Sequence, residues 1–192
     1  RGHEVTAVVR DPGKYEDLAR EGVRVVAGDV TDTASVAAAA AGHDAAIQAA
    51  TRLDMPSEEF YTAAARALAD GLAQAGVDRL VAVGIGTLLE VAPGIRLVDT
   101  PGFPDDARAF SLGHAAELAV FEESALDWVV LAPPPVFLDA EADRTGRYRI
   151  GGGQVPASAE GAPVFSFADL AVAVVDEAEG GGHHRVQIAV SY

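Results

Sequence analysis

Residues 1–14 of the chain read RGHEVTAVVRDPGK, and this stretch indicates a fold that alternates helices with strands. Its first three residues have the pattern of a helix end, with a glycine suited to the left-handed position. Residues 4–10 alternate into β-branched side chains and predict a strand, which the Asp-Pro-Gly that follows would stop. We therefore expect a helix in front of this strand that the sequence does not contain.

The remaining sequence continues the alternation. Hydrophobic periodicity and turn residues predict further helices over 14–22, 32–42, 57–75, 113–125 and 167–178, and further strands over 23–30, 44–50, 78–86, 126–135 and 185–191. Strands this apolar are typical of a parallel sheet that is covered on both faces. The sequence thus predicts one doubly wound α/β domain over residues 1–192, with its first strand and first helix missing.

Composition excludes several classes of function. The net charge of −15 argues against nucleic acid or an anionic membrane as a partner, because both need a basic surface. Without cysteine, the chain has no disulfide, no thiolate catalysis and no cysteine-type zinc site. No apolar run approaches the roughly 20 residues of a membrane span. We expect a cytoplasmic monomer or homodimer that takes a small-molecule substrate and binds no metal.

Several strings together resemble the atypical short-chain dehydrogenase/reductase superfamily, in its NmrA-like NAD(P)H-binding branch. They are RGHEVTAVVRDPGK, VRVVAGDVTD, GHDAAIQAA, AGVDRLVAVGIGTL and LDWVVLAPPPVF, in the order of that superfamily. The resemblance implies a Rossmann-like fold and a nicotinamide cofactor. It also implies that a strand, a glycine-rich turn and a helix, about 20–25 residues, would precede residue 1 and cradle the cofactor's phosphates.

Arg10 is the main candidate for cofactor selectivity. It ends the second strand of such a fold, where an acidic residue binds the ribose of NAD and an arginine pairs with the 2′-phosphate of NADP. We therefore expect a preference for NADP(H), with NAD(H) possible because Asp11 follows directly. The alternative is an ordinary solvated arginine at a strand end.

The resemblance implies further cofactor contacts at the ends of other strands. Asp29 and Val30 would hold the adenine, although Asp29 could instead only start the turn before the next helix. The other expected contacts are the small residues Ala49, Ala50 and Thr51 beneath the ribose, with Gly84, Gly86 and Pro133 in later strand-end loops.

The usual catalytic pair of the superfamily is absent. Its Tyr-x-x-x-Lys motif cannot form, because the only lysine is Lys14. Alignment places Phe110 at the tyrosine position and His114 at the lysine position, and leaves Thr87 near the position of the usual serine. His114 could donate a proton or hold the nicotinamide ribose. Alternatively, it is a partly exposed helix histidine without a catalytic role.

Four other segments carry structural expectations. Residues 87–112 read as a lid-like excursion, and 133–166 as a region on the substrate side of the domain. Within the latter, GRYRIGGG (146–153) predicts a hairpin with a glycine turn. The two histidines of GGGHHR (180–185) are expected to be solvated.

Two functions remain open at this point. The first is an NAD(P)H-dependent oxidoreductase or isomerase that acts on a small apolar carbonyl or a quinone-like substrate. The second is a redox sensor of the NmrA type, which would bind NADP(H) without turning it over.

Overall fold

A computed structural model describes residues 1–135, 138–156 and 164–192. Its larger sheet has the order β3-β4-β7-β9-β8, with strands Ala45–Gln48, Arg79–Val83, Asp127–Ala132, Val186–Ser191 and Arg149–Ile150 respectively. The first four strands are parallel, and β8 pairs antiparallel with β9 at the edge. The predicted α/β fold with a mostly parallel sheet is therefore confirmed.

The first two strands stand apart from this sheet. β1 (Val5–Val9) and β2 (Val23–Ala27) form a separate two-stranded parallel sheet. Within the described ranges, no strand pairs with the second edge of β1 or with the second edge of β3. Val5, Val8 and Ile47, on these two strands, keep 44–50% of their surface exposed. The sheet is thus divided between β1 and β3.

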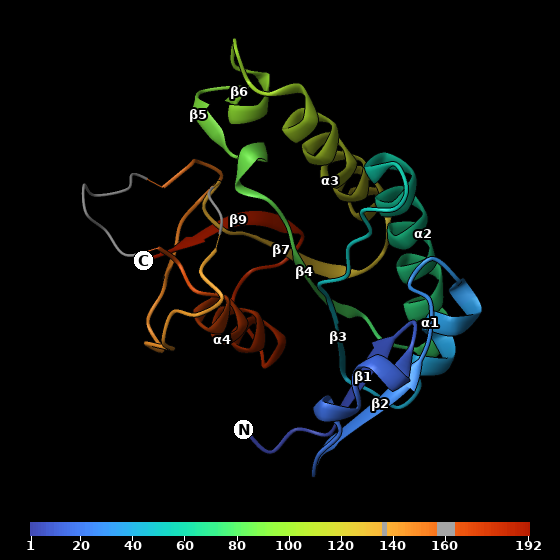
Figure 1. Cartoon of the computed structure of the whole chain (residues 1–192). Coiled ribbons are helices and arrows are strands. Elements are labelled where there is room, and N and C mark those ends of the chain that lie inside the picture. Colours follow the sequence, from blue (N-terminus) through green and yellow to red (C-terminus); the bar gives the residue numbers. More distant parts are fainter. Residues whose placement is uncertain (136–137, 157–163) are drawn as a thin grey trace.

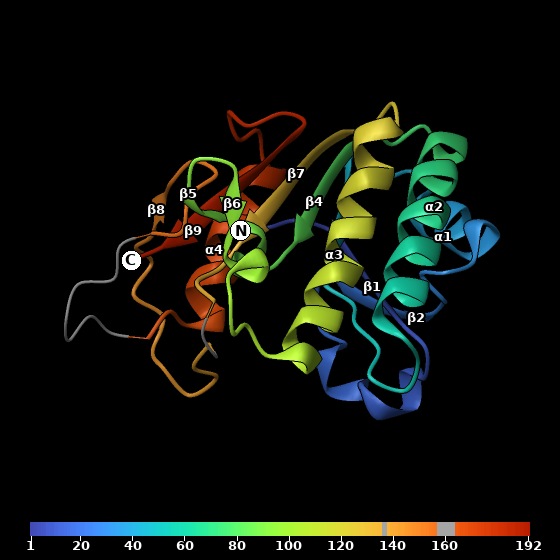
Figure 2. The ribbon, with the colours of Figure 1, turned by 90° about the horizontal axis from the view of Figure 1, so that it is seen from above.

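Helices cover both faces of the larger sheet (Figure 1). On one side lie α1 (Thr33–Ala40), α2 (Ser57–Ala75) and α3 (Asp105–Glu123), and on the other lies α4 (Phe167–Ala178). α2 and α3 run side by side over the sheet (Figure 2). None of the helices in the described ranges is both long and apolar enough to cross a membrane.

Two apolar clusters hold these layers together. Leu80, Ala82, Trp128 and Val130 point from β4 and β7 toward α2 and α3. The alternate residues of the same strands meet α4, and they are Val81, Val129 and Leu131. This alternation is the period-two pattern of a strand that is buried on both faces.

Small residues bring the helices close together. A Cβ atom placed on Gly71 of α2 would lie 2.7 Å from the Cβ of Val36 on α1. One placed on Gly113 of α3 would lie 2.1 Å from the Ser57 hydroxyl at the start of α2. Glycine at these two positions therefore sets the spacing of the three-helix layer.

The predicted helix over 14–22 is wrong. The chain there forms two short 3-10 helices, Pro12–Lys14 and Glu16–Leu18. Its large apolar side chains, Tyr15 and Leu18, stay 45% and 39% exposed. A helix this short is stable only when an apolar face packs on a core, and this segment does not bury such a face.

Two further boundaries differ from the prediction. Helix α3 begins at Asp105, after Pro104 and with two aspartates in its first turn, so only 87–104 is left as the excursion. This acidic start suits the positive end of the helix dipole. The expected hairpin over 146–153 is also wrong, because Arg149 and Ile150 pair with the open edge of β9 instead.

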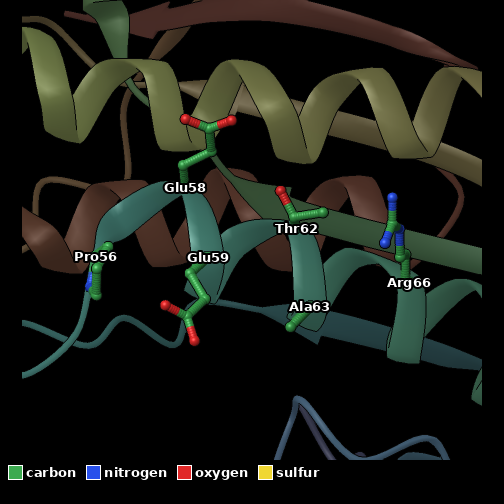
Figure 3. Close-up of a pocket in the computed structure, with 6 residues that line it drawn as sticks. All are labelled: Pro56, Glu58, Glu59, Thr62, Ala63 and Arg66. Carbon is green, nitrogen blue, oxygen red and sulfur yellow. The ribbon is translucent and has the colours of Figure 1, made fainter.

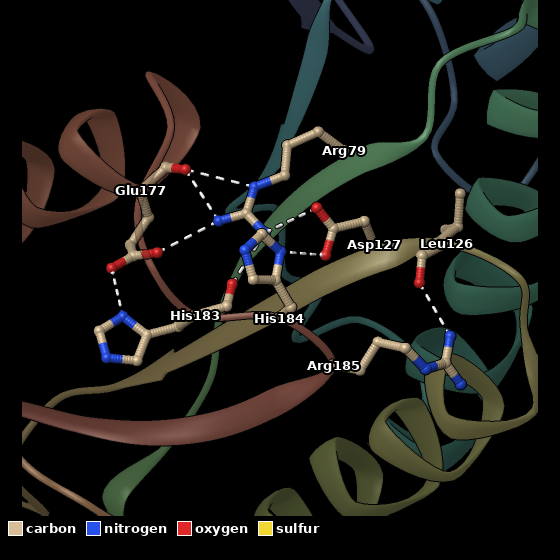
Figure 4. Close-up of polar contacts among 7 residues, drawn as sticks. All are labelled: Arg79, Leu126, Asp127, Glu177, His183, His184 and Arg185. Carbon is tan, nitrogen blue, oxygen red and sulfur yellow. Dashed lines mark hydrogen bonds and ion pairs between the residues drawn. The ribbon is translucent and has the colours of Figure 1, made fainter.

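An ionic cluster closes the amino ends of the central strands (Figure 4). Arg79 donates to Glu177 at 3.1 Å and to Asp127 at 3.3 Å. His183 Nδ1 lies 2.7 Å from Glu177, and His184 Nδ1 lies 2.8 Å from Asp127. The side chains of the two histidines are 36% and 62% exposed, as expected for solvated residues, and each is also paired with a carboxylate.

Asp169, at the start of α4, joins three segments at the opposite end of the sheet. Its fully buried carboxylate accepts hydrogen bonds from the backbone of Gly146, from both the backbone and hydroxyl of Thr145, and from the Tyr192 hydroxyl. Burial would raise the pKa of Asp169, but the hydrogen bonds from Tyr192, Thr145 and Gly146 outweigh it and hold this pKa well below its usual range.

This lowered pKa predicts a dependence of stability on pH. A carboxyl with a depressed folded pKa adds stability above its unfolded pKa of about 4, and this stability is lost as the pH falls through the folded value. Asp169→Asn should therefore lower the free energy of unfolding at pH 7, and the deficit should shrink at pH 3. Urea denaturation at both pH values measures it. An equal deficit at both would contradict the assignment, and Asp105→Asn, on an exposed helix start, is the control.

Candidate functional site

The predicted catalytic residues lie at the carboxyl ends of the central parallel strands. Thr87 follows β4, and His114 lies in α3, which crosses beside the same edge. In open α/β sheets, this edge is where ligands bind. The location therefore agrees with a site, and the contacts of each side chain show what it can do.

His114 is buried, with only 7% of its surface exposed, so the alternative of an exposed helix histidine is wrong. Its ring lies against Tyr61 of α2, with 3.9 Å between ring centroids, and packs edge-to-face with Phe110, with 5.2 Å between ring centroids. Its Nδ1 lies 3.1 Å from Oε2 of Glu117. The two aromatic rings and the carboxylate fix the orientation of the imidazole.

Glu117 connects His114 to the end of β3. Glu117 is itself 2% exposed, and its Oε1 accepts a hydrogen bond of 3.2 Å from the Gln48 amide. Gln48 in turn accepts a hydrogen bond of 2.7 Å from the backbone N–H of Ala50. Sequence reasoning did not find Gln48 or Glu117. The available signal was the spacing of polar residues 111, 114 and 117, which repeats along the buried face of α3.

Tyr61 is a tyrosine that the sequence did not indicate as part of the site. Its hydroxyl donates a hydrogen bond of 3.0 Å to Thr51, in the loop after β3. Burial raises the pKa of Tyr61 to about 12, so the hydroxyl stays protonated at neutral pH. Tyr61 therefore brings a phenol next to Phe110 from a different helix.

Thr87 is held in a hydroxyl pair. Its Oγ1 lies 2.7 Å from that of Ser111, whose own hydroxyl donates to the backbone oxygen of Ala107. Because Ser111 has a single proton, Thr87 must be the donor within the pair. In this arrangement Thr87 can accept a hydrogen bond from a ligand but has no proton left to donate.

Gly84, Gly86 and Pro133 lie where the loops after β4 and β7 meet. The Gly84 N–H donates to Leu131 at 2.8 Å. A Cβ on Gly86 would lie 2.3 Å from the carbonyl oxygen of Pro133. These residues bring the two loops into contact, and their predicted role in binding a cofactor stays a prediction.

Arg10 belongs to a charged group at the far end of the same edge. Its side chain is 57% exposed, and Nη1 lies 3.9 Å from Oδ2 of Asp54. Asp54 is bound more tightly by Arg52, at 2.7 Å, and this guanidinium lowers the pKa of Asp54 to about 2. Arg10 is thus only loosely paired, and Arg52 adds a second cation that the sequence did not indicate.

Asp29 has a local structural role. Its Oδ1 accepts hydrogen bonds from the backbone N–H and the hydroxyl of Thr31, at 2.9 and 2.7 Å. These two hydrogen bonds lower the pKa of Asp29. Val30 packs against the apolar clusters around α2. The geometry of Asp29 is that of the turn before α1, and a contact with adenine stays a prediction.

The loop after β3 joins the two groups. Ala49, Ala50 and Thr51 are exposed. Thr51 contacts Tyr61 beside His114, whereas Asp54 contacts Arg10. The structure therefore places one short, small-residue segment between the charged group and the buried histidine.

Two surface hollows lie outside this arrangement. One follows the outer side of α2 and is lined by Pro56, Glu58, Glu59, Thr62, Ala63 and Arg66 (Figure 3). The other, about 560 Å³, lies in the predicted substrate-side region against Arg147, Arg149 and Tyr192. Within the part of the chain that the structure describes, no three histidine or acidic side chains gather as metal ligands would.

The parallel sheet, its covering helices and the polar groups at its carboxyl edge define a protein of the Rossmann-like, nucleotide-binding class. A family model described as NAD(P)H-binding matches residues 1–178. The chain therefore belongs to this NAD(P)H-binding family.

Several known proteins are similar to this chain over nearly its whole length. YwnB of Bacillus subtilis (strain 168) is 33% identical over 99% of this chain and 87% of its own length. A solved "putative exported protein" from Burkholderia pseudomallei is 40% identical, with a TM-score of 0.84 over 100% of this chain and 88% of its own. A "putative epimerase" from Bacteroides thetaiotaomicron is 31% identical, with a TM-score of 0.86 over 100% and 86%.

A fourth protein bears on the chemistry of the family. It is a "putative NADH-flavin reductase" from Streptococcus pneumoniae, which is 26% identical with a TM-score of 0.82, over 99% of this chain and 88% of its own. The names given to these relatives thus include a reductase and an epimerase.

Proposed function

We propose that the protein is an NADP(H)-dependent oxidoreductase that reduces a small apolar carbonyl or quinone-like substrate, with His114 as its proton donor. The observation that carries the proposal is the burial of His114 at the carboxyl edge of the sheet, oriented by Glu117 and Tyr61. Membership of an NAD(P)H-binding family supports the choice of cofactor.

The residues present fit a dinucleotide along this edge. Arg10 is exposed and only loosely paired, so its guanidinium is available to a 2′-phosphate. The exposed Ala49 and Ala50 have side chains small enough for a ligand to approach the backbone. When bound, the cofactor would supply a hydride. His114 would give a proton to the substrate oxygen, and the neighbouring rings would exclude water.

Two other functions have specific support. The epimerase name of one relative favours an isomerase, in which the same histidine would move a proton without net reduction. The absence of the Tyr-x-x-x-Lys pair favours a redox sensor that binds NADP(H) without turnover. Oxidation of NADPH in the presence of small quinones, flavins or enones would distinguish the reductase from both.

We further propose that a parallel strand, followed by a turn and a helix, fills the gap between β1 and β3. The unpaired edges of these strands and the exposed Val5, Val8 and Ile47 support this proposal. The helix of such a unit would offer its N-terminal N–H groups to the cofactor's phosphates.

The gap predicts a difference in cofactor affinity. Residues 1–192 alone should bind NADPH much more weakly than a chain that also carries the strand–turn–helix unit, because they lack these backbone donors. Isothermal titration calorimetry on the two proteins measures the difference. Equal dissociation constants would contradict the proposed unit.

The role proposed for Arg10 predicts a preference for NADPH over NADH. A charge-assisted hydrogen bond contributes about 1.5–3 kcal/mol, so Arg10→Ala should weaken NADPH binding about 10- to 150-fold in the protein that carries this unit. NADH binding should hardly change. Arg66→Ala, on the outer side of α2, is the matched control. A parent protein that already prefers NADH would refute the assignment.

The role proposed for His114 predicts that the turnover rate depends on this residue. Removing a general acid typically costs at least about a hundredfold in rate, so we expect His114→Ala to lower the kcat of NADPH oxidation by about 10²-fold or more. The dissociation constant of NADPH, measured by fluorescence titration, should stay within a few-fold of the parent value. His43→Ala, near the amino end of β3, serves as a control histidine. An unchanged kcat in His114→Ala would remove His114 from the mechanism.

A further inference from the structure

Three buried polar side chains form a connected chain inside the apolar layer between the sheet and α3. Gln48, Glu117 and His114 are 3%, 2% and 7% exposed. Hydrogen bonds of 3.2 and 3.1 Å join Glu117 to the other two. The chain ends on the backbone of Ala50, which both donates to and accepts from the Gln48 amide.

We propose that Glu117 is a positioning residue, which keeps the Nδ1 proton on His114 and leaves Nε2 as the atom that exchanges a proton with the substrate. This inference rests on the proposed function of His114. Gln48 extends the effect, because it ties Glu117 to the loop along which the cofactor would lie.

The tautomer of His114 follows from the chemistry of Glu117. An ionised carboxylate can only accept hydrogen bonds, so the histidine Nδ1 facing Glu117 must carry a proton. The second oxygen of Glu117 is already occupied by the Gln48 amide, which can only donate from its nitrogen. The carboxylate is therefore held between two donors, and Nε2 is left to change its protonation state.

Nε2 is also the open atom of the ring. It makes no hydrogen bond to a described residue, whereas Nδ1 is occupied by Glu117, so Nε2 is the ring nitrogen left for a ligand. Tyr61 lies against the imidazole, and Phe110 packs edge-to-face with it.

A purely structural role explains the arrangement less well. Taking a carboxylate out of water is energetically costly, and replacing a buried ionic pair by apolar residues of similar volume is often neutral or stabilising. A leucine at position 117 would fill the same space without that cost. A carboxylate in this position does what a leucine cannot, which is to fix the tautomer of the adjacent imidazole.

The proton balance of the step is simple. With the hydride that bound NADPH would supply to the substrate carbon, the imidazolium would give its Nε2 proton to the substrate oxygen. His114 is left neutral with its remaining proton on Nδ1, still donated to Glu117. Solvent then returns a proton to Nε2.

Nitrogen-15 NMR of histidine-labelled protein tests the tautomer directly. The signals of His114 are identified by their loss in His114→Ala. In the parent protein with a neutral His114, we expect Nδ1 to carry the proton and Nε2 to be unprotonated. In Glu117→Gln, the NH2 group of the new amide must face either Gln48 or His114. The single tautomer with its proton on Nδ1 should therefore be lost. A proton on Nε2 in the parent would overturn the proposal.

Kinetics provide the second readout. Glu117→Gln should lower the kcat of NADPH oxidation at least about tenfold, while the dissociation constant of NADPH changes little. Glu117→Asp keeps the carboxylate, and it should retain the Nδ1 tautomer and recover part of the turnover. The matched control is Glu177→Gln, because Glu177 is also buried, at 5% exposed, and also pairs with a histidine, but at the amino ends of the strands. Glu177→Gln should leave the tautomer of His114 and the kcat of NADPH oxidation unchanged.

The outcomes separate this inference from the proposed function. Full turnover in Glu117→Gln together with an inactive His114→Ala would overturn the positioning role and leave the function of His114 intact. Full turnover in His114→Ala would overturn both. Should Glu117→Gln fail to fold, Glu117→Asp and the tautomer of the parent protein still decide the question.

Discussion

Burial of β4 and β7 on both faces is the constraint on which the rest of the structure depends. Leu80, Val81, Val129 and Leu131 have no exposed surface. Strands this apolar must be covered by helices above and below, so parallel crossovers follow, and polar groups are confined to the two ends of the strands. One end is closed by the ionic cluster around Arg79. The other is the carboxyl edge with the candidate site.

Most of the fold could be predicted from local patterns. The bounds of α2 and α4 agree with the prediction, because each has a clear apolar face, and α4 also begins after a capping serine. The helix predicted over 14–22 does not form, because helix propensity does not suffice without an apolar face to bury. The hairpin over 146–153 failed because a distant partner, the edge of β9, is a property of the folded sheet and not of the local sequence.

The site was predicted only in part, for a similar reason. His114 could be found by its alignment with a known motif, but the residues that orient it lie far away in the chain. Gln48 is 69 residues from Glu117, and Tyr61 belongs to a different helix. A glutamine at a strand end and a tyrosine in a helix carry no local sign of such contacts. Only the packing of α2 and α3 against β3 brings them together.

The division of the sheet between β1 and β3 has a consequence for local stability. Among the described strands, β1 and β2 pair only with each other, and the larger sheet does not depend on them for its own pairing. The amide hydrogens of β1 can therefore exchange with deuterium through opening of this pair alone, whereas those of β4 and β7 exchange only when the whole core opens. The strand that ends at Arg10 thus belongs to a less protected unit than β4 and β7, and a ligand that rests on it would slow that exchange.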